Sequence, residues 1–183
     1  MKRLSKFILI GLLFAAYPGE IANQLIVHKT VWGFISTMIY YVVLLDIGYF
    51  INKLFKRKLV PTLLYFILFG IIGLLIEYFI LGQGPEAYAS GMFTFWAFLF
   101  TLPRIFTDDP GQFEDWKKRI LKYWLISSTI VLAVFLIPPL DVGMYLGIHV
   151  LMVQLAGFYI FFFSYLKRLY YLLRQEKELA APP

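Results

Sequence analysis

The chain of 183 residues contains no cysteine and few charged side chains. Without thiols it has no disulfides, no iron–sulfur clusters, no thiolate metal ligands and no cysteine nucleophile. Charged residues make up 15% of the sequence and hydrophobic residues 61%, whereas a soluble domain carries about 25% charged residues. This shortage of charge excludes soluble globular, disordered and collagen-like chains, and it indicates an all-α integral membrane protein.

Several motifs that carry known chemistry are also missing from the sequence. It has no glycine-rich phosphate loop, no Gly-x-Ser-x-Gly nucleophile elbow and no His-Glu-x-x-His metal motif. The pair Asp108-Asp109 fits a helix cap better than a metal-diphosphate site, because Pro110 follows it at the first helical position. We therefore predict no cofactor and no metal site.

Six long apolar stretches follow one another along the chain. A helix needs about 20 residues to cross the hydrocarbon core, and barrel strands would instead alternate over about ten residues. We predict one transmembrane domain over residues 1–183, with both termini cytoplasmic and a cytoplasmic tail at 167–183. The six predicted transmembrane helices cover residues 7–27, 31–51, 60–81, 90–106, 120–137 and 143–166.

The start of the chain also resembles a signal peptide, because Lys2 and Arg3 precede an apolar run. A cleavage site near Ala16 would place Phe14 where a small side chain is needed. The first stretch is therefore predicted to remain as a span.

The basic residues lie almost entirely in the loops on one predicted side. Of the 17 lysines and arginines, all but Lys29 lie in the segments assigned to the cytoplasm or at their edges. Cytoplasmic loops carry such an excess, so we predict a multi-pass protein of the cell (inner) membrane. The same distribution explains the net charge of +6 without a nucleic-acid partner.

The predicted partners are the lipid bilayer and its anionic headgroups, which basic residues at the membrane surface attract. A further membrane protein could pack on the small residues Gly143 and Gly147, which lie one turn apart. The predicted headgroup contacts are Lys53, Lys56, Arg57, Lys58, Lys117, Lys118, Arg119, Lys167 and Arg168.

A weak internal pattern accompanies the three outward connections. Each is followed by a glycine and aromatic residues, at Gly33, Gly91 and Gly143. Three helical hairpins arranged as a repeat would produce this pattern.

Three ionisable side chains on different predicted helices lie at similar depth. Glu20, Glu77 and His149 are 14 to 17 residues from the cytoplasmic ends of their spans, or about 21–26 Å at 1.5 Å per residue. Ionisable groups in hydrocarbon are costly and indicate functional sites. We therefore predict a polar pocket in the outer half of the membrane.

Other polar residues near Glu20 and Glu77 could complete this pocket. Asn23 and Gln24 follow Glu20 at helical spacing on one face. Pro18 weakens the first helix there, and a broken helix survives in hydrocarbon only against protein or a cavity. The predicted additional lining residues are Asn23, Gln24, Tyr17 and Tyr78.

The faces of the third and sixth helices give further expectations. Gly70 and Gly73 share a face with Glu77 and predict a groove that leads to its carboxyl group. On the sixth helix, Gln154 lies about 140° around the axis from His149, so one face cannot carry both.

Asp46 and Arg104 lie nearer the cytoplasmic side. We expect Asp46 to contact Arg104 or Tyr49 and so to stabilise this end of the bundle. The functional alternative is an inner gate, in which Asp46 receives a cation or proton from the outer pocket.

These observations favour binding or transport of a small solute or cation in a Glu/Glu/His pocket. Three alternatives remain open. The polar groups could have separate structural roles, or a carboxyl group and His149 could serve a membrane enzyme acting on a lipid or isoprenoid. The chain could also be a structural subunit that packs through its glycine faces.

Overall fold

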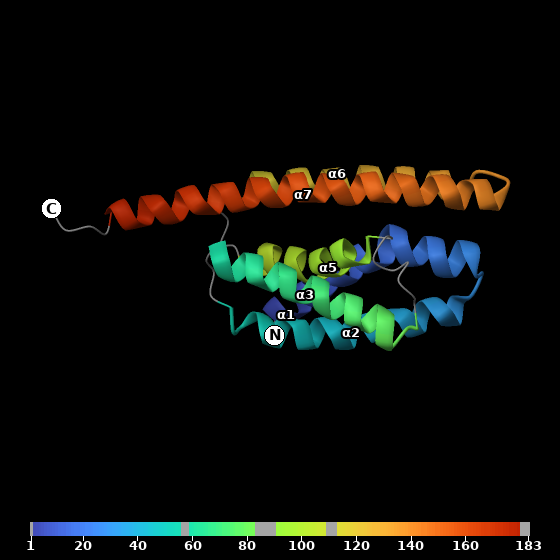
Figure 1. Cartoon of the computed structure of the whole chain (residues 1–183), viewed down its shortest axis with the longest axis horizontal. Coiled ribbons are helices and arrows are strands. Elements are labelled where there is room, and N and C mark those ends of the chain that lie inside the picture. Colours follow the sequence, from blue (N-terminus) through green and yellow to red (C-terminus); the bar gives the residue numbers. More distant parts are fainter. Residues whose placement is uncertain (1, 56–58, 83–90, 109–112, 180–183) are drawn as a thin grey trace.

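The computed structural model describes residues 2–55, 59–82, 91–108 and 113–179, and every regular element within these ranges is helical. Successive helices run in opposite directions, and the start of α1 and the end of α7 lie at the same end of the bundle (Figure 1). In chain order the elements are α1 (Lys2–Ala15), the π-helical η1 (Ala16–Val27), α2 (Val31–Asn52), α3 (Leu59–Phe79), α5 (Met92–Asp108), α6 (Glu114–Phe135) and α7 (Leu140–Leu179).

Each predicted stretch overlaps one of these helices or, for the first stretch, α1 and η1 together, with bounds that differ most for α6 and α7. Four segments in the described part of the chain are long and apolar enough to cross a membrane: Arg3–Val27, Val31–Asn52, Leu59–Phe79 and Asp141–Glu176. The apolar helix Met92–Thr107 is shorter. The architecture is therefore all-helical and fits a multi-pass membrane protein, while the six-span topology and its orientation stay predictions.

The last helix is longer than its predicted span. α7 has 40 residues, which corresponds to about 60 Å at 1.5 Å per residue, and it extends past the other helices toward the C-terminus (Figure 1). The first part of the predicted tail therefore continues α7 as helix as far as Leu179. The predicted cap at Asp109-Pro110 lies outside the described residues, and α6 begins at Glu114.

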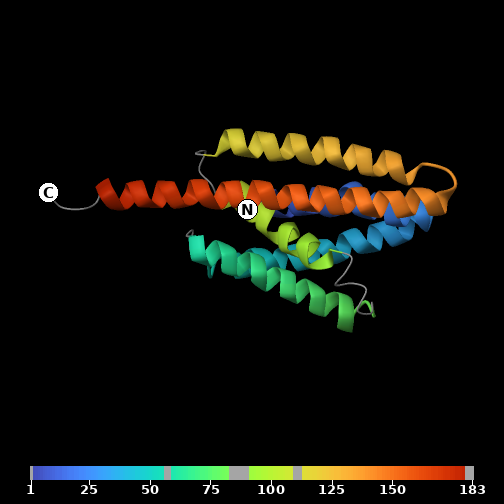
Figure 2. The ribbon, with the colours of Figure 1, turned by 45° about the horizontal axis from the view of Figure 1, so that its top comes forward.

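The helices form two groups. α6 and α7 make a hairpin that lies over one side of the group formed by α1, α2, α3 and α5 (Figures 1 and 2). The most extensive contacts join α3 with α5 and α6 with α7, as the hairpin expectation requires. The first predicted hairpin differs from these two pairs, because α1 packs more extensively on α5 than on α2.

The short helix α5 lies at the centre of the bundle. All residues from Trp96 to Ile105 are buried, and apart from Pro103 each of them is at most 3% exposed. Such a helix contacts protein on all its faces, and most of its residues are accordingly apolar, with Thr101 and Arg104 as buried polar exceptions.

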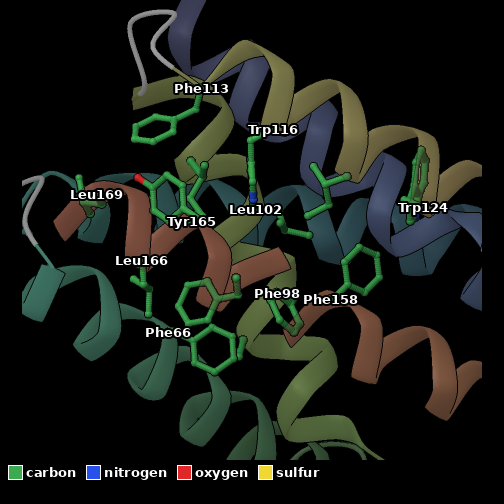
Figure 3. Close-up of a cluster of buried hydrophobic side chains, with 14 of the residues drawn as sticks. Phe66, Phe98, Leu102, Phe113, Trp116, Trp124, Phe158, Tyr165, Leu166 and Leu169 are labelled. Carbon is green, nitrogen blue, oxygen red and sulfur yellow. The ribbon is translucent and has the colours of Figure 1, made fainter. Parts of the chain in front are cut away.

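Aromatic rings connect α5 to the α6–α7 hairpin. Phe98 lies 5.1 Å from Phe66 of α3 and 5.5 Å from Phe158 of α7, between ring centroids (Figure 3). Phe66 also stacks on Phe162 at 4.5 Å. This cluster of four rings packs α3 and α5 against α7 and so joins the two helix groups.

Glycines allow the large rings of α5 to approach α3. A Cβ atom at Gly73 would collide with the Trp96 side chain, and one at Gly70 would collide with Phe93. The predicted groove on α3 is therefore present, and aromatic side chains of the same molecule fill it.

The glycines at the start of α7 also pack within the chain. A Cβ atom at Gly143 would lie 2.6 Å from the carbonyl oxygen of Ile137, and one at Gly147 would lie 2.7 Å from the ring of Phe135. The end of α6 and the connection after it therefore contact these two glycines within the chain, while a further membrane protein partner stays a prediction.

Candidate functional site

The first helix is broken beside the site. Tyr17 has a non-helical backbone, with φ −116° and ψ 117°, and Pro18 follows it without an N–H group. Trp124 of α6 donates its indole N–H to the Tyr17 carbonyl oxygen at 3.1 Å, and the Tyr17 hydroxyl lies 2.8 Å from that of Thr129. The break expected at Pro18 thus lies against another helix, which binds the carbonyl group of Tyr17.

A cavity of about 750 Å³ lies next to this break. Its lining comes from the last turn of α1, η1, the first half of α2, the end of α3 and the residues after it, the first half of α5, α6 from its middle onward, and the first half of α7. All of these segments belong to the half of the bundle away from the chain termini (Figure 1). The volume falls in the range of about 300–1,000 Å³ that is typical of small-molecule pockets.

Glu20 contributes the first carboxyl group to the cavity. The Tyr41 hydroxyl donates a hydrogen bond to Glu20 Oε1 at 3.0 Å. The Gln24 side chain lies close to the same carboxyl group, while Glu20 Oε2 is buried and makes no well-aligned hydrogen bond. Asn23 and Gln24, which follow at helical spacing, line the same cavity. The polar face predicted for the first helix therefore points into this hollow.

Glu77 contributes the second carboxyl group and is only 4% exposed. The Trp96 indole N–H donates to Glu77 Oε1 at 2.7 Å, and Glu77 Oε2 is buried without a partner. Gly73 lies one turn before Glu77 and leaves the space that the Trp96 ring occupies. The glycine groove on α3 therefore determines how this carboxyl group is held.

The two carboxyl groups have the same arrangement. In each, an aromatic side chain binds one oxygen and the other oxygen remains without a partner. The Tyr40 hydroxyl, also in the cavity lining, is a third buried polar atom without a partner. Among the described residues that line the cavity, none is lysine, arginine or histidine.

His149 does not line this cavity. Its side chain is exposed, its Nδ1 atom lies 2.7 Å from the Tyr145 carbonyl oxygen, and its ring packs on that of Tyr145. α7 presents Ile148 and Gln154 to the cavity instead. His149 follows Ile148 and is therefore about 100° away around the helix axis. The expectation that all three ionisable groups share one hollow is corrected for this residue.

Two predicted tyrosines also lie outside the cavity lining. Tyr17 packs edge-on against Trp124 at 5.6 Å and reaches Thr129 on α6. Tyr78 is 44% exposed and contacts its neighbour Phe79. The Tyr17 ring lies against α6 and the Tyr78 ring lies on the outside of the bundle, so neither belongs to the cavity lining. The structure brings together Glu20, Asn23, Gln24 and Glu77.

Other cavity residues were not predicted from the sequence. Tyr41 and Trp96 hold the carboxyl groups, and the Gln154 amide donates to the hydroxyl groups of Ser127 and Ser128 at 2.9 and 2.7 Å. A glutamine deep in an apolar stretch indicates a buried hydrogen-bond partner, because an unpaired amide would be costly there. No sequence pattern identifies that partner when it lies on another helix.

The expected contact between Asp46 and Arg104 is absent from the described part of the chain. Arg104 is 3% exposed, donates to the Phe55 carbonyl oxygen at 3.3 Å and lies 4.7 Å above the Tyr65 ring. Asp46 follows the buried Leu45 by one residue and therefore faces about 100° away from the packed side of α2. This pair does not form the predicted inner gate.

The predicted headgroup contacts differ in their exposure. Lys117 is buried on the packed face of α6 and pairs with Glu114 at 3.3 Å, and the headgroup contacts stay predictions. Lys53 lies over the rings of Tyr49 and Phe50. Lys118, Arg119 and Lys167 are exposed and Arg168 is half-buried, while Lys56, Arg57 and Lys58 lie outside the described residues.

The fold and the cavity define a class: an all-helical protein with membrane-length apolar helices and two carboxyl groups in an internal hollow. No protein-family model, curated protein or solved structure matches the chain. In the described ranges no group of three or more histidine, cysteine, aspartate and glutamate side chains could hold a metal ion.

Proposed function

We propose that this chain is a six-span membrane protein that binds a small solute in the cavity between its two helix groups. The observation that carries the proposal is a cavity of about 750 Å³ in which two carboxyl groups each keep one buried, unpartnered oxygen. The chain termini lie on the cytoplasmic side, and the cavity lies in the half of the bundle toward the opposite side.

The distribution of charge supports this orientation. The start of α1 and the end of α7 lie at one end of the bundle, as an even number of crossings requires (Figure 1). Lys53 at the end of α2 and Lys118 near the start of α6 belong to the same end. Basic residues favour the cytoplasmic side, so the cavity at the opposite end lies in the outer half of the membrane.

The buried oxygens without hydrogen bonds favour a ligand-binding role for these side chains over a purely structural one. A polar group buried away from water without a hydrogen bond costs several kcal/mol in a membrane. Three such atoms belong to Glu20, Glu77 and Tyr40, and all three residues line one cavity. A solute that donates hydrogen bonds to them would offset this cost.

A protein that only binds the solute and a protein that transports it require different behaviour of the aromatic cluster of Phe66, Phe98, Phe158 and Phe162. Phe98 and Phe158 form part of the cavity wall, and Phe98 contacts Phe66, which stacks on Phe162. A receptor keeps this cluster closed, whereas a transporter must separate it to release the solute. Uptake into proteoliposomes distinguishes the two within the same proposal.

The two other function classes lack support from the geometry. The enzyme hypothesis needs a carboxyl group and His149 together, and His149 lies on a different face of α7 from the cavity. The structural-subunit hypothesis used Gly143 and Gly147 as a docking face, and both contact α6.

A cavity-filling variant tests the proposal. Gly19 lines the cavity, and a Cβ atom there would meet nothing within 4 Å, so Gly19→Trp places an indole ring in open space. The control Val43→Trp adds the same ring at an exposed position of α2. Thermal unfolding of the purified protein is measured against a panel of cationic, neutral and anionic small molecules.

We expect at least one compound to raise the unfolding midpoint of the unmodified protein and of Val43→Trp, because a ligand stabilises the state that binds it. Gly19→Trp should lose this response while it remains folded. A panel in which no compound stabilises the unmodified protein would contradict the proposed function.

A further inference from the structure

We infer that the solute is an organic cation whose charged nitrogen lies between the carboxyl groups of Glu20 and Glu77. Its apolar body contacts the aromatic wall of the cavity. This inference rests on the proposed function and names the substrate class of the same site.

The charges around the cavity favour a cation. Glu20 and Glu77 are the two acidic residues of the lining, and the described lining includes no basic side chain that could pair with either. Arg104 is buried elsewhere in the bundle, against Phe55 and Tyr65. A positively charged ligand would therefore supply the counter-charge that the protein itself does not place in this cavity.

The hydrogen-bonding capacity of the site also matches an ammonium group. Tyr41 and Trp96 already donate to the Oε1 atoms, which leaves the two Oε2 atoms and the Tyr40 hydroxyl oxygen without partners. An alkylammonium nitrogen carries up to three N–H donors and accepts no hydrogen bond. These atoms are the acceptors that such a group requires, and because each is buried in the structure, the carboxyl groups must turn toward the cavity to reach the ammonium group.

The aromatic side chains next to the carboxyl groups favour a cation with an apolar body. Tyr41 lies 5.9 Å from Trp96 and 6.3 Å from Phe95, between ring centroids, and all three line the cavity. Ring faces attract ammonium and guanidinium groups. The remaining wall is largely aliphatic and aromatic and suits the carbon skeleton of such a molecule.

An inorganic ion fits the site less well. Calcium takes six to eight oxygen ligands at close range, and in the described part of the chain no cluster of three metal-ligating side chains is present. The cavity volume of about 750 Å³ also far exceeds that of a bare ion. The site is therefore assigned to an organic molecule.

Three probes of similar shape distinguish the contribution of charge to affinity from that of apolar contact: naphthylethylammonium, naphthylethanol and naphthylacetate. Their affinities are measured by titration calorimetry on the full chain in lipid nanodiscs, for the unmodified protein, Glu20→Gln, Glu77→Gln and Tyr40→Phe. Asp141→Asn is the control, because Asp141 is an exposed carboxylate on the first turn of α7.

We expect the ammonium probe to bind at least about tenfold more tightly than the alcohol, and the carboxylate probe not to bind. Each glutamine variant should weaken ammonium binding by about tenfold or more, because a charge-assisted hydrogen bond is lost. Alcohol binding should change little, and Asp141→Asn should match the unmodified protein. Tyr40→Phe removes one oxygen and should weaken ammonium binding by a smaller factor.

Equal binding of ammonium and alcohol, or ammonium binding that survives all three cavity substitutions, would overturn the cation assignment and leave solute binding intact. If Glu77→Gln fails to fold, Glu20→Gln and Tyr40→Phe still decide the question. Failure of every probe and of the wider panel to bind the unmodified protein would instead refute the proposed function.

Discussion

Trp96 fixes the position of Glu77 with a single hydrogen bond of 2.7 Å. The indole ring is 1% exposed and fits against Gly73. One side chain therefore contributes both to the packing of α5 on α3 and to the orientation of a cavity carboxyl group. A comparable role belongs to Tyr41, whose hydroxyl group donates to Glu20.

Replacing Trp96 by phenylalanine should destabilise the protein. The variant keeps an aromatic ring and loses the N–H donor, so both Glu77 oxygens would be buried without a partner. We expect a loss of about 1–3 kcal/mol in the free energy of unfolding, measured by denaturant titration in detergent micelles. Trp32→Phe is the matched control, because Trp32 is 80% exposed. Equal stability of the two variants would refute this role of Trp96.

The carboxyl groups of the site were predictable, while their partners were not. An acidic residue within an apolar stretch is costly enough to be conspicuous in the sequence. The hydrogen bonds to Glu20 and Glu77 join residues on different helices, so no local spacing encodes them. His149 had the appropriate depth, but its rotation about the helix axis placed it outside the cavity.

At the scale of helices, α3 and α5 depend on small residues for their close approach. Gly70 receives Phe93 and Gly73 receives Trp96, so the aromatic rings of α5 fit into the surface of α3. The sequence indicated a groove on α3 through the spacing of these glycines. It did not indicate that rings of the same chain would fill the groove.

Gly73→Leu should disrupt the contact between α3 and α5. The added side chain would collide with Trp96 and displace it from Glu77. We expect an unfolding free energy lower by about 3 kcal/mol, since overpacking of a core costs this much. The control is Gly19→Ala, where the added methyl group meets nothing within 4 Å. Thermal unfolding is monitored by circular dichroism. Equal unfolding midpoints for Gly73→Leu and Gly19→Ala would contradict this prediction.

At the scale of the whole molecule, the hydrophobic pattern predicted where the helices lie but not how they are grouped. Helix boundaries follow from apolar length and from loops rich in basic residues. The packing of α1 on α5, and the position of the α6–α7 hairpin over the other helices, depend on side-chain shape across long sequence separations. The cavity arises between these groups, so it was not visible in any single helix.

The absence of cysteine makes the topology directly measurable. His28→Cys, in the connection between η1 and α2, should react with a membrane-impermeant maleimide on intact cells. Leu54→Cys, which is 79% exposed just after α2, should react only after permeabilisation, because it lies on the cytoplasmic side. Labelling of Leu54→Cys on intact cells would refute the proposed orientation.

The central claim is that Glu20 and Glu77 face one ligand site, and carbodiimide protection tests it most directly. The purified protein is treated with a hydrophobic carbodiimide, with and without saturating naphthylethylammonium, and modification of each carboxyl group is followed by mass spectrometry. We predict that the probe slows modification of both residues by at least about tenfold, since it would occupy their shared hollow, and leaves Asp141 unaffected. Protection of only one of the two glutamates, or of neither, would contradict the account.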